Sequence, residues 1–223
     1  RVLLGEARTT DVHARRILLE DGATIDYDYL IVATGASHAY FGHPEWAEHA
    51  PGLKTLEDAL LIRRRVLLAF ERAEREADPA RQQELLTFAI VGGGPTGVEL
   101  AGTLAEIAHR TLRDEFRWID TARARIVLIE AGPTILAAFP DQLRDAARRS
   151  LGRLPVEVRG GAAETHIHGR RGNLGDGRLG AGTVIWAAGV AASPIVATLG
   201  APLDRAGRAL VTPELSIPGH PEV

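Results

Sequence analysis

Four short stretches of the chain are apolar at every position: residues 29–33, 88–91, 126–129 and 184–187. Each stretch is followed directly, or within two residues, by a glycine or a carboxylate. Continuous apolar runs of this length are typical of parallel strands that are buried on both faces of a sheet. The pattern therefore predicts a parallel sheet inside the protein.

Apolar residues recur at helical spacing in three other segments, residues 56–77, 95–110 and 140–152. The first begins after Thr55, which forms a capping-box pattern with Asp58. The second follows three glycines, and the third follows Phe139. Strands that alternate with amphipathic helices predict an α/β protein.

The remaining segments are less regular. Residues 2–4, 17–19 and 23–25 have the pattern of short strands separated by polar turns. Residues 37–52 have no period and indicate a loop, and residues 160–182 indicate at most a hairpin or a meander. The uncharged stretch after Leu179 contains glycines and prolines, which favour a strand and loop over a membrane helix.

Composition excludes several classes of function. The net charge of -3 argues against a nucleic-acid-binding protein, and the absence of cysteine excludes disulfides, zinc–thiolate sites and iron–sulfur clusters. His38, His43 and His49 lack the spacing of a metal site, so no bound metal is expected. Because the chain has no methionine and ends in an extended segment, we interpret it as an internal fragment of a longer protein.

Gly92, Gly94 and Gly97 stand at the G-x-G-x-x-G spacing, between a predicted strand and a predicted helix. The first glycine permits a tight turn, the second a close approach to a pyrophosphate, and the third packing of helix on strand. Unpaired N–H groups and the helix dipole then face an anion. We expect the dinucleotide-binding residues to be Gly92, Gly93, Gly94, Pro95, Thr96 and Gly97.

Glu130 ends the next predicted strand, where a carboxylate can accept both ribose hydroxyls of an adenosine. It lies 38 residues after Gly92, compared with a usual spacing of about 20. A longer first helix and the polar stretch at 114–123 would account for the excess. An anionic Glu130 predicts a preference for NADH over NADPH.

Four motifs follow one another along the chain, at residues 27–35, 92–101, 126–130 and 184–190. In this order they resemble the two-dinucleotide flavoprotein reductases. Within that superfamily, the Tyr40-Phe41-Gly42-His43 loop, residues 52–59 and the Gly-Pro-Thr-Gly-Val-Glu motif resemble the type II NADH:quinone dehydrogenases. The resemblance covers nearly the whole chain.

The resemblance implies a Rossmann-like two-dinucleotide-binding fold, with an NADH domain at 84–190 inserted into a partial FAD domain at 1–83 and 191–223. The family's first G-x-G-x-x-G, its closing Gly-Asp motif and its C-terminal amphipathic helices have no counterpart in this sequence. The resemblance also assigns roles to single residues: Glu99 as the catalytic residue facing the nicotinamide–flavin contact, Ala188 and Gly189 beside NADH, and Ala33, Thr34 and Gly35 beside FAD.

The activity implied is hydride transfer from NADH to FAD, followed by electron transfer to a membrane quinone without proton pumping. The resemblance also implies a cytoplasmic protein that binds peripherally to the inner face of the cell membrane, through a C-terminal segment missing from this sequence. A homodimer is a further possibility. One alternative is a soluble NADH-dependent reductase whose acceptor is oxygen or a small redox protein. Another is a non-catalytic nucleotide-binding module.

Overall fold

The computed structural model describes residues 2–161, 165–168, 171–174 and 179–223. The chain forms two compact units: a larger unit, Tyr40–Gly189, and a smaller unit made of the segment up to Ala39 together with Val190–Val223. These compact units divide at 39/40 and 189/190, and the expected NADH domain at 84–190 within a partial FAD domain stays a prediction. Residues 40–83 belong to the larger unit because helix α2 (Leu56–Glu74) packs its buried face against the sheet of that unit.

The larger unit is built on a four-stranded sheet in which all neighbouring strands run parallel. The strand order is β10 (Thr183–Trp186), β5 (Thr87–Val91), β6 (Arg125–Ile129) and β7 (Val156–Arg159). Every residue of β5 and β10 is buried, as is every residue of β6 except the first. The prediction of a buried parallel sheet is therefore confirmed for three of the four apolar runs.

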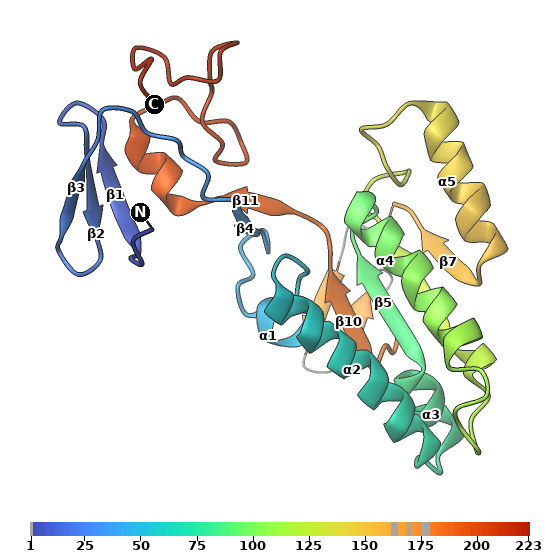
Figure 1. Cartoon of the computed structure of the whole chain (residues 1–223). Coiled ribbons are helices and arrows are strands. Elements are labelled where there is room, and N and C mark those ends of the chain that lie inside the picture. The colour runs from blue at the N-terminus through green and yellow to red at the C-terminus, as the bar shows by residue number, and fades with distance from the viewer. Residues whose placement is uncertain (1, 162–164, 169–170, 175–178) are drawn as a thin grey trace. The chain divides into compact units, whose positions relative to one another are not determined.

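Successive side chains of these strands point to opposite faces, so the sheet has a core on each side. On one face the strands pack against α2 and against α4 (Pro95–Glu106), which both lie along the sheet in Figure 1. The strand residues on this face are Phe88, Ile90, Ile126, Leu128 and Ile185. The other face carries Ala89, Val91, Val127, Ile129, Val184 and Trp186, packed against Tyr40 and Trp46.

Helix α2 begins as its sequence predicts. The Thr55 hydroxyl accepts the Asp58 N–H at 3.2 Å, and the Asp58 carboxylate accepts the Thr55 N–H at 3.0 Å. These reciprocal bonds satisfy two N–H groups that the first helical turn leaves without a partner. The helix ends at Glu74, three residues before the predicted end, and the Glu74 carboxylate accepts backbone N–H bonds from the loop at residues 117–119.

The shorter elements of the larger unit connect these parts. A π-helical turn, Ile107–Thr111, continues α4, and a 3₁₀ turn, Thr121–Arg123, precedes β6. Strands β8 (Thr165–His168) and β9 (Arg171–Leu174) form an antiparallel pair within the region expected to hold at most a hairpin. The other helices are α1 (Trp46–His49), α3 (Pro79–Leu85) and α5 (Asp141–Arg153).

The smaller unit contains an antiparallel meander, as predicted, although residues 2–4 are not a strand. The meander consists of β1 (Ala7–Asp11), β2 (Arg16–Leu19) and β3 (Thr24–Asp26). Its buried core cluster is Val12, Leu199 and Ile217. In addition, β4 (Ala36–His38) pairs with β11 (Val190–Ala192), and a 3₁₀ helix covers Pro194–Leu199.

The prediction of a buried strand at residues 29–33 is wrong. The segment is not in a sheet, and Tyr29 and Ile31 are 82% and 89% exposed, whereas Leu30 and Val32 are half-buried. The Leu30 N–H donates to the Glu222 carbonyl at 2.9 Å. The segment therefore packs on one side alone, and a strand that is buried on both faces requires neighbours on both.

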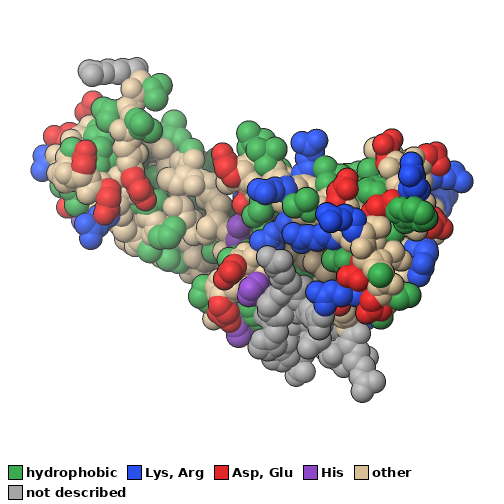
Figure 2. All heavy atoms as spheres, turned by 90° about the horizontal axis from the view of Figure 1, so that it is seen from below, with side chains coloured by type: hydrophobic (Ala, Val, Ile, Leu, Met, Phe, Trp, Pro, Cys, Tyr) green, Lys and Arg blue, Asp and Glu red, His purple; other side chains and the backbone are tan. Residues whose placement is uncertain are grey.

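Charged side chains of both signs occur on the face of the molecule in Figure 2, in agreement with the small net charge. Within the ranges described above, no helix has the length and apolar character required to cross a bilayer.

Candidate functional site

Two glycines of the turn after β5, Gly92 and Gly97, have no room for a side chain. Gly92 has a φ of +115°, and a Cβ atom added there would lie 2.4 Å from the Ala187 carbonyl carbon. A Cβ atom on Gly97 would lie 1.8 Å from the Gly92 carbonyl oxygen. By contrast, a Cβ atom on Gly94 would meet no protein atom within 4 Å. Gly92 and Gly97 thus close the turn onto helix α4, and Gly94 presents bare backbone to open space.

Helix α4 begins at Pro95, and its first backbone hydrogen bond joins the Val98 N–H to the Gly94 carbonyl at 3.0 Å. The amides of Thr96 and Gly97 precede that bond, so the helix itself offers them no acceptor. Pro95 and Thr96 are exposed. The N-terminus of α4 is therefore open to an anion, which the helix dipole and the free amides would stabilise.

Glu130 directly follows β6, and both of its carboxylate oxygens accept backbone hydrogen bonds. Oε2 accepts the Gly93 N–H at 2.6 Å, and Oε1 accepts the Gly132 N–H at 2.8 Å. Each carboxylate oxygen has a second lone pair, so the group can still accept hydroxyl donors. The long spacing from Gly92 does not separate the two sites, because β5 and β6 are adjacent and in register at Val91 and Ile129.

Sequence reasoning missed the contacts that Gly93 makes. A Cβ atom there would lie 2.9 Å both from Glu130 Oε2 and from Ile135 Cγ2. The Gly93 carbonyl also accepts the Leu136 N–H at 2.7 Å. Gly93 thus joins the glycine turn to the loop after β6, and the spacing of the motif carried no signal for this role.

Ala188 and Gly189 follow β10, on the side of β5 opposite to β6. The Ala187 N–H donates to the Val91 carbonyl at 2.6 Å, which holds this segment beside the glycine turn. The structure therefore brings three predicted groups together at the carboxyl edge of one sheet: residues 92–97, Glu130, and residues 188–189. This edge is where ligands bind in open parallel sheets.

Glu99 is exposed on α4, two residues after Gly97. The buried face of the helix carries Ala101, Leu104 and Ala105. The Glu99 side chain therefore stands near the N-terminus of α4 and outside the core.

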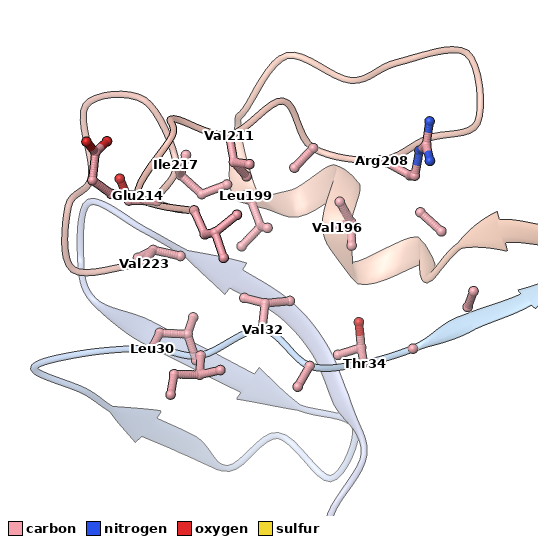
Figure 3. A pocket seen from close by; sticks show the side chains of 18 of the residues that line it. Leu30, Val32, Thr34, Val196, Leu199, Arg208, Val211, Glu214, Ile217 and Val223 are labelled. Carbon is pink, nitrogen blue, oxygen red and sulfur yellow. The ribbon is translucent and has the colours of Figure 1, made fainter.

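Ala33, Thr34 and Gly35 belong to the smaller unit and are exposed, and Gly35 has a φ of +67°. They line a mostly apolar cavity of about 820 Å³ within that unit. In Figure 3, Leu30 and Val32 point toward the side that carries Val196 and Leu199, and the charged residues Arg208 and Glu214 lie at opposite ends of the view.

His43, one of the histidines that could have suggested a metal site, has other contacts. The His43 ring stacks on Trp46 with centroids 4.2 Å apart, and its Nδ1 lies 3.0 Å from the Glu45 carboxylate. Among the residues with described placement, no group of three or more His, Asp or Glu side chains is arranged to hold a metal ion.

The sequence of this chain is similar to those of curated proteins. Two curated relatives are type II NADH:quinone oxidoreductases of Mycobacterium tuberculosis, Ndh and NdhA, 44% and 42% identical to this chain. Each alignment covers all of this chain and 51% or 50% of the relative, so the chain spans about half the length of these proteins. The resemblance found in the sequence is confirmed.

Solved structures share the fold. A structure of NDH2 from Plasmodium falciparum in complex with NADH matches with a TM-score of 0.81 at 24% identity, covering 99% of this chain and 48% of that one. A ferredoxin reductase from Rhodopseudomonas palustris matches with a TM-score of 0.67 at 22% identity, covering 99% and 48%. The family model for pyridine nucleotide-disulphide oxidoreductases matches residues 1–223. This chain therefore belongs to the pyridine nucleotide-disulphide oxidoreductase family.

Proposed function

We propose that this chain is the part of a type II NADH:quinone oxidoreductase that binds NADH and contributes to the flavin site. The observation that carries the proposal is the glycine turn, where Gly92 and Gly97 close onto α4 while Gly94 faces open space. The similarity to the mycobacterial oxidoreductases supports the choice of quinone as the acceptor.

The larger unit offers a place for each part of NADH. The amides of Thr96 and Gly97 hold the pyrophosphate at the start of α4. Glu130 accepts the adenosine ribose hydroxyls, and its bonds to Gly93 and Gly132 fix the carboxylate in advance. The nicotinamide half lies over Ala188 and Gly189, across β5 from Glu130.

The smaller unit contributes to FAD binding through Ala33, Thr34 and Gly35. Small exposed residues, with Gly35 in the left-handed region, allow a large planar group to approach the backbone closely. Bound FAD would supply the acceptor for the hydride of NADH and the carrier of electrons to the quinone. The chain itself binds and orients, and Glu99 at the start of α4 is the residue we assign to the nicotinamide end, where it orients the carboxamide or relays a proton.

The proposal extends to the setting of the whole protein. As in the family it resembles, the quinone is reduced at the surface of the cytoplasmic membrane, reached through a segment beyond this chain. The whole protein associates with the membrane peripherally, and it can do so as a homodimer.

The substitution Gly94→Ala tests the proposal with little disturbance of the fold. Gly94 has a φ of −72° and room for a methyl group, so the turn should keep its conformation. The methyl group would stand where the pyrophosphate approaches, and we expect NADH to bind at least tenfold more weakly in titrations of the intact protein. The control is Gly152→Ala on α5, which also has free space. Unchanged NADH affinity in Gly94→Ala would contradict the proposed site.

A further inference from the structure

Phe41 has an unusual combination of backbone conformation and exposure. Its φ is +49°, a left-handed value that is uncommon for a bulky residue, and the residue is 67% exposed. Burial does not explain the conformation, because most of the side chain is in contact with solvent. Backbone strain of this kind is concentrated at functional sites.

The turn that carries Phe41 is held firmly on both sides. The His43 N–H donates to the Tyr40 carbonyl at 3.0 Å, and the two residues between them, Phe41 and Gly42, both have positive φ, as in type I′ turns. Tyr40 stacks on Trp186 with centroids 5.3 Å apart, and its hydroxyl donates to the Ala50 carbonyl at 2.9 Å. The position of Phe41 is thus imposed by its neighbours.

The Phe41 ring is directed at Gly189. A Cβ atom added to Gly189 would lie 2.7 Å from Phe41 Cζ, so the tip of the ring rests on the glycine backbone. The ring centroid is 6.1 Å from that of Trp186, the last residue of β10. An exposed aromatic ring therefore stands at the carboxyl end of β10. It packs on position 189, where only a glycine leaves room for it.

The strand order indicates which half of a dinucleotide reaches this end. Glu130 follows β6, on one side of β5, and the start of α4 lies at β5 itself. A dinucleotide that has its adenosine ribose at Glu130 and its pyrophosphate at α4 extends across β5 toward β10. The nicotinamide half then lies beside Gly189 and the Phe41 ring.

We propose that Phe41 is a binding residue for the nicotinamide half of NADH, which its exposed ring contacts at the end of β10. The inference rests on the proposed function, because it requires NADH to occupy this edge of the sheet. Position 189 is a glycine because a side chain there would collide with the Phe41 ring and would occupy space needed by the nicotinamide half. The Phe41 ring is large, apolar and exposed, so it offers a surface on which the dihydronicotinamide ring can pack.

The test compares two ligands that differ in the nicotinamide ring. One is 1,4,5,6-tetrahydro-NADH, a reduced dinucleotide that does not transfer hydride, and the other is ADP-ribose. Affinities are measured by calorimetry on the intact flavin-loaded protein and on Phe41→Ala. We expect the variant to bind tetrahydro-NADH about tenfold more weakly and ADP-ribose within about twofold of the unmodified protein.

Two further variants separate binding from folding. Phe41→Gly suits the positive φ, so it should fold at least as well as the unmodified protein and should show the same selective loss. Trp118→Ala removes another exposed aromatic side chain of the larger unit, 76% exposed, and should change neither affinity. Equal weakening of both ligands, or unchanged affinity for tetrahydro-NADH, would overturn the role of Phe41. Failure of the unmodified protein to bind either ligand would overturn the proposed function itself.

Discussion

The same kind of sequence has opposite environments in the two units. Residues 88–91 and 29–33 are both continuous apolar runs that stop at a glycine-containing turn. In the larger unit, Phe88 is 1% exposed because α2 and α4 cover one face of β5 and aromatic residues cover the other. In the smaller unit, Ile31 is 89% exposed, and its segment borders an open apolar cavity. An apolar run thus shows that a segment is able to be buried. Whether its side chains are buried depends on the elements that pack beside it.

The largest expected effect tests this difference in burial directly. Phe88→Ala removes a fully buried ring that stacks on Phe70 with centroids 5.3 Å apart, and it should lower the free energy of unfolding by about 3–5 kcal/mol. Tyr29→Ala, at an exposed position, should change it by less than about 0.5 kcal/mol. Denaturant titrations of both variants make the comparison, and similar losses would show that residues 29–33 are buried in solution.

The second prediction concerns the preformed site of the larger unit. Glu130→Gln cannot accept both the Gly93 and the Gly132 N–H, and it removes the charge that repels a 2′-phosphate. We expect the preference for NADH over NADPH to fall by about tenfold to a hundredfold, or roughly 1.4–2.7 kcal/mol. Nucleotide titrations of the intact protein measure this preference. Glu157→Gln is the control, because Glu157 pairs with Arg125 and Arg159 on β6 and β7.

A third prediction asks whether the larger unit contributes chemistry in addition to binding. Glu99→Gln should slow NADH-to-quinone turnover at least tenfold, about 1.4 kcal/mol in barrier terms, with the fold intact. Glu106→Gln, which changes an exposed carboxylate near the end of the same helix, should leave turnover unchanged. If stopped-flow measurements give the same rate of flavin reduction in Glu99→Gln and the unmodified protein, Glu99 is a surface carboxylate.

The smallest expected effects concern one hydrogen-bonded carboxylate in each unit, Glu74 in the larger and Asp26 in the smaller. Burial alone would raise the pKa of Glu74, but backbone N–H bonds from Trp118, Arg117 and Ile119 hold it below its ordinary value of 4.5. In the smaller unit, the hydrogen bond from Arg16 to Asp26 lowers the pKa of that carboxyl below 3.8. A lowered pKa means that each carboxylate stabilises the fold above its ordinary pKa, and that this contribution is lost as the pH falls through the folded value.

We therefore expect Glu74→Gln to lower Tm at neutral pH, and the difference from the unmodified protein to shrink toward about pH 3. The glutamine leaves a backbone N–H of the 117–119 loop without its acceptor. Asp26→Asn should have a smaller effect, since an exposed ion pair contributes little. Thermal unfolding across this pH range is the measurement. A Tm difference for Glu74→Gln that does not depend on pH would contradict the role of its charge.

Local signals were enough to predict much of the larger unit. Thr55 and Asp58 are three residues apart, and their hydrogen bonds depend on no other part of the chain. The glycine spacing likewise predicts a turn, because a side chain on Gly97 would collide with the Gly92 carbonyl oxygen. Helix starts and tight turns are therefore readable from short stretches of sequence.

Contacts between segments that are distant in the sequence could not be predicted from local patterns. The hydrogen bond from Leu136 to Gly93 and the packing of Phe41 on Gly189 join residues that no local pattern connects. The exposure of Tyr29 depends on which segments lie beside it, which an apolar run does not specify. The membership of α2 in the larger compact unit likewise follows only from its packed face, which no local pattern specifies.

The position of β10 in the sheet has a consequence for protein synthesis. Strands β5, β6 and β7 can pair as soon as the ribosome has released Arg159, but β10 begins only at Thr183. At about 5–20 residues per second, the intervening segment takes about one to five seconds to make. During that interval one edge of β5 has no neighbour, and an unpaired apolar edge invites pairing with other nascent chains. The last strand of this sheet to be made thus closes the edge that β5 leaves open during synthesis.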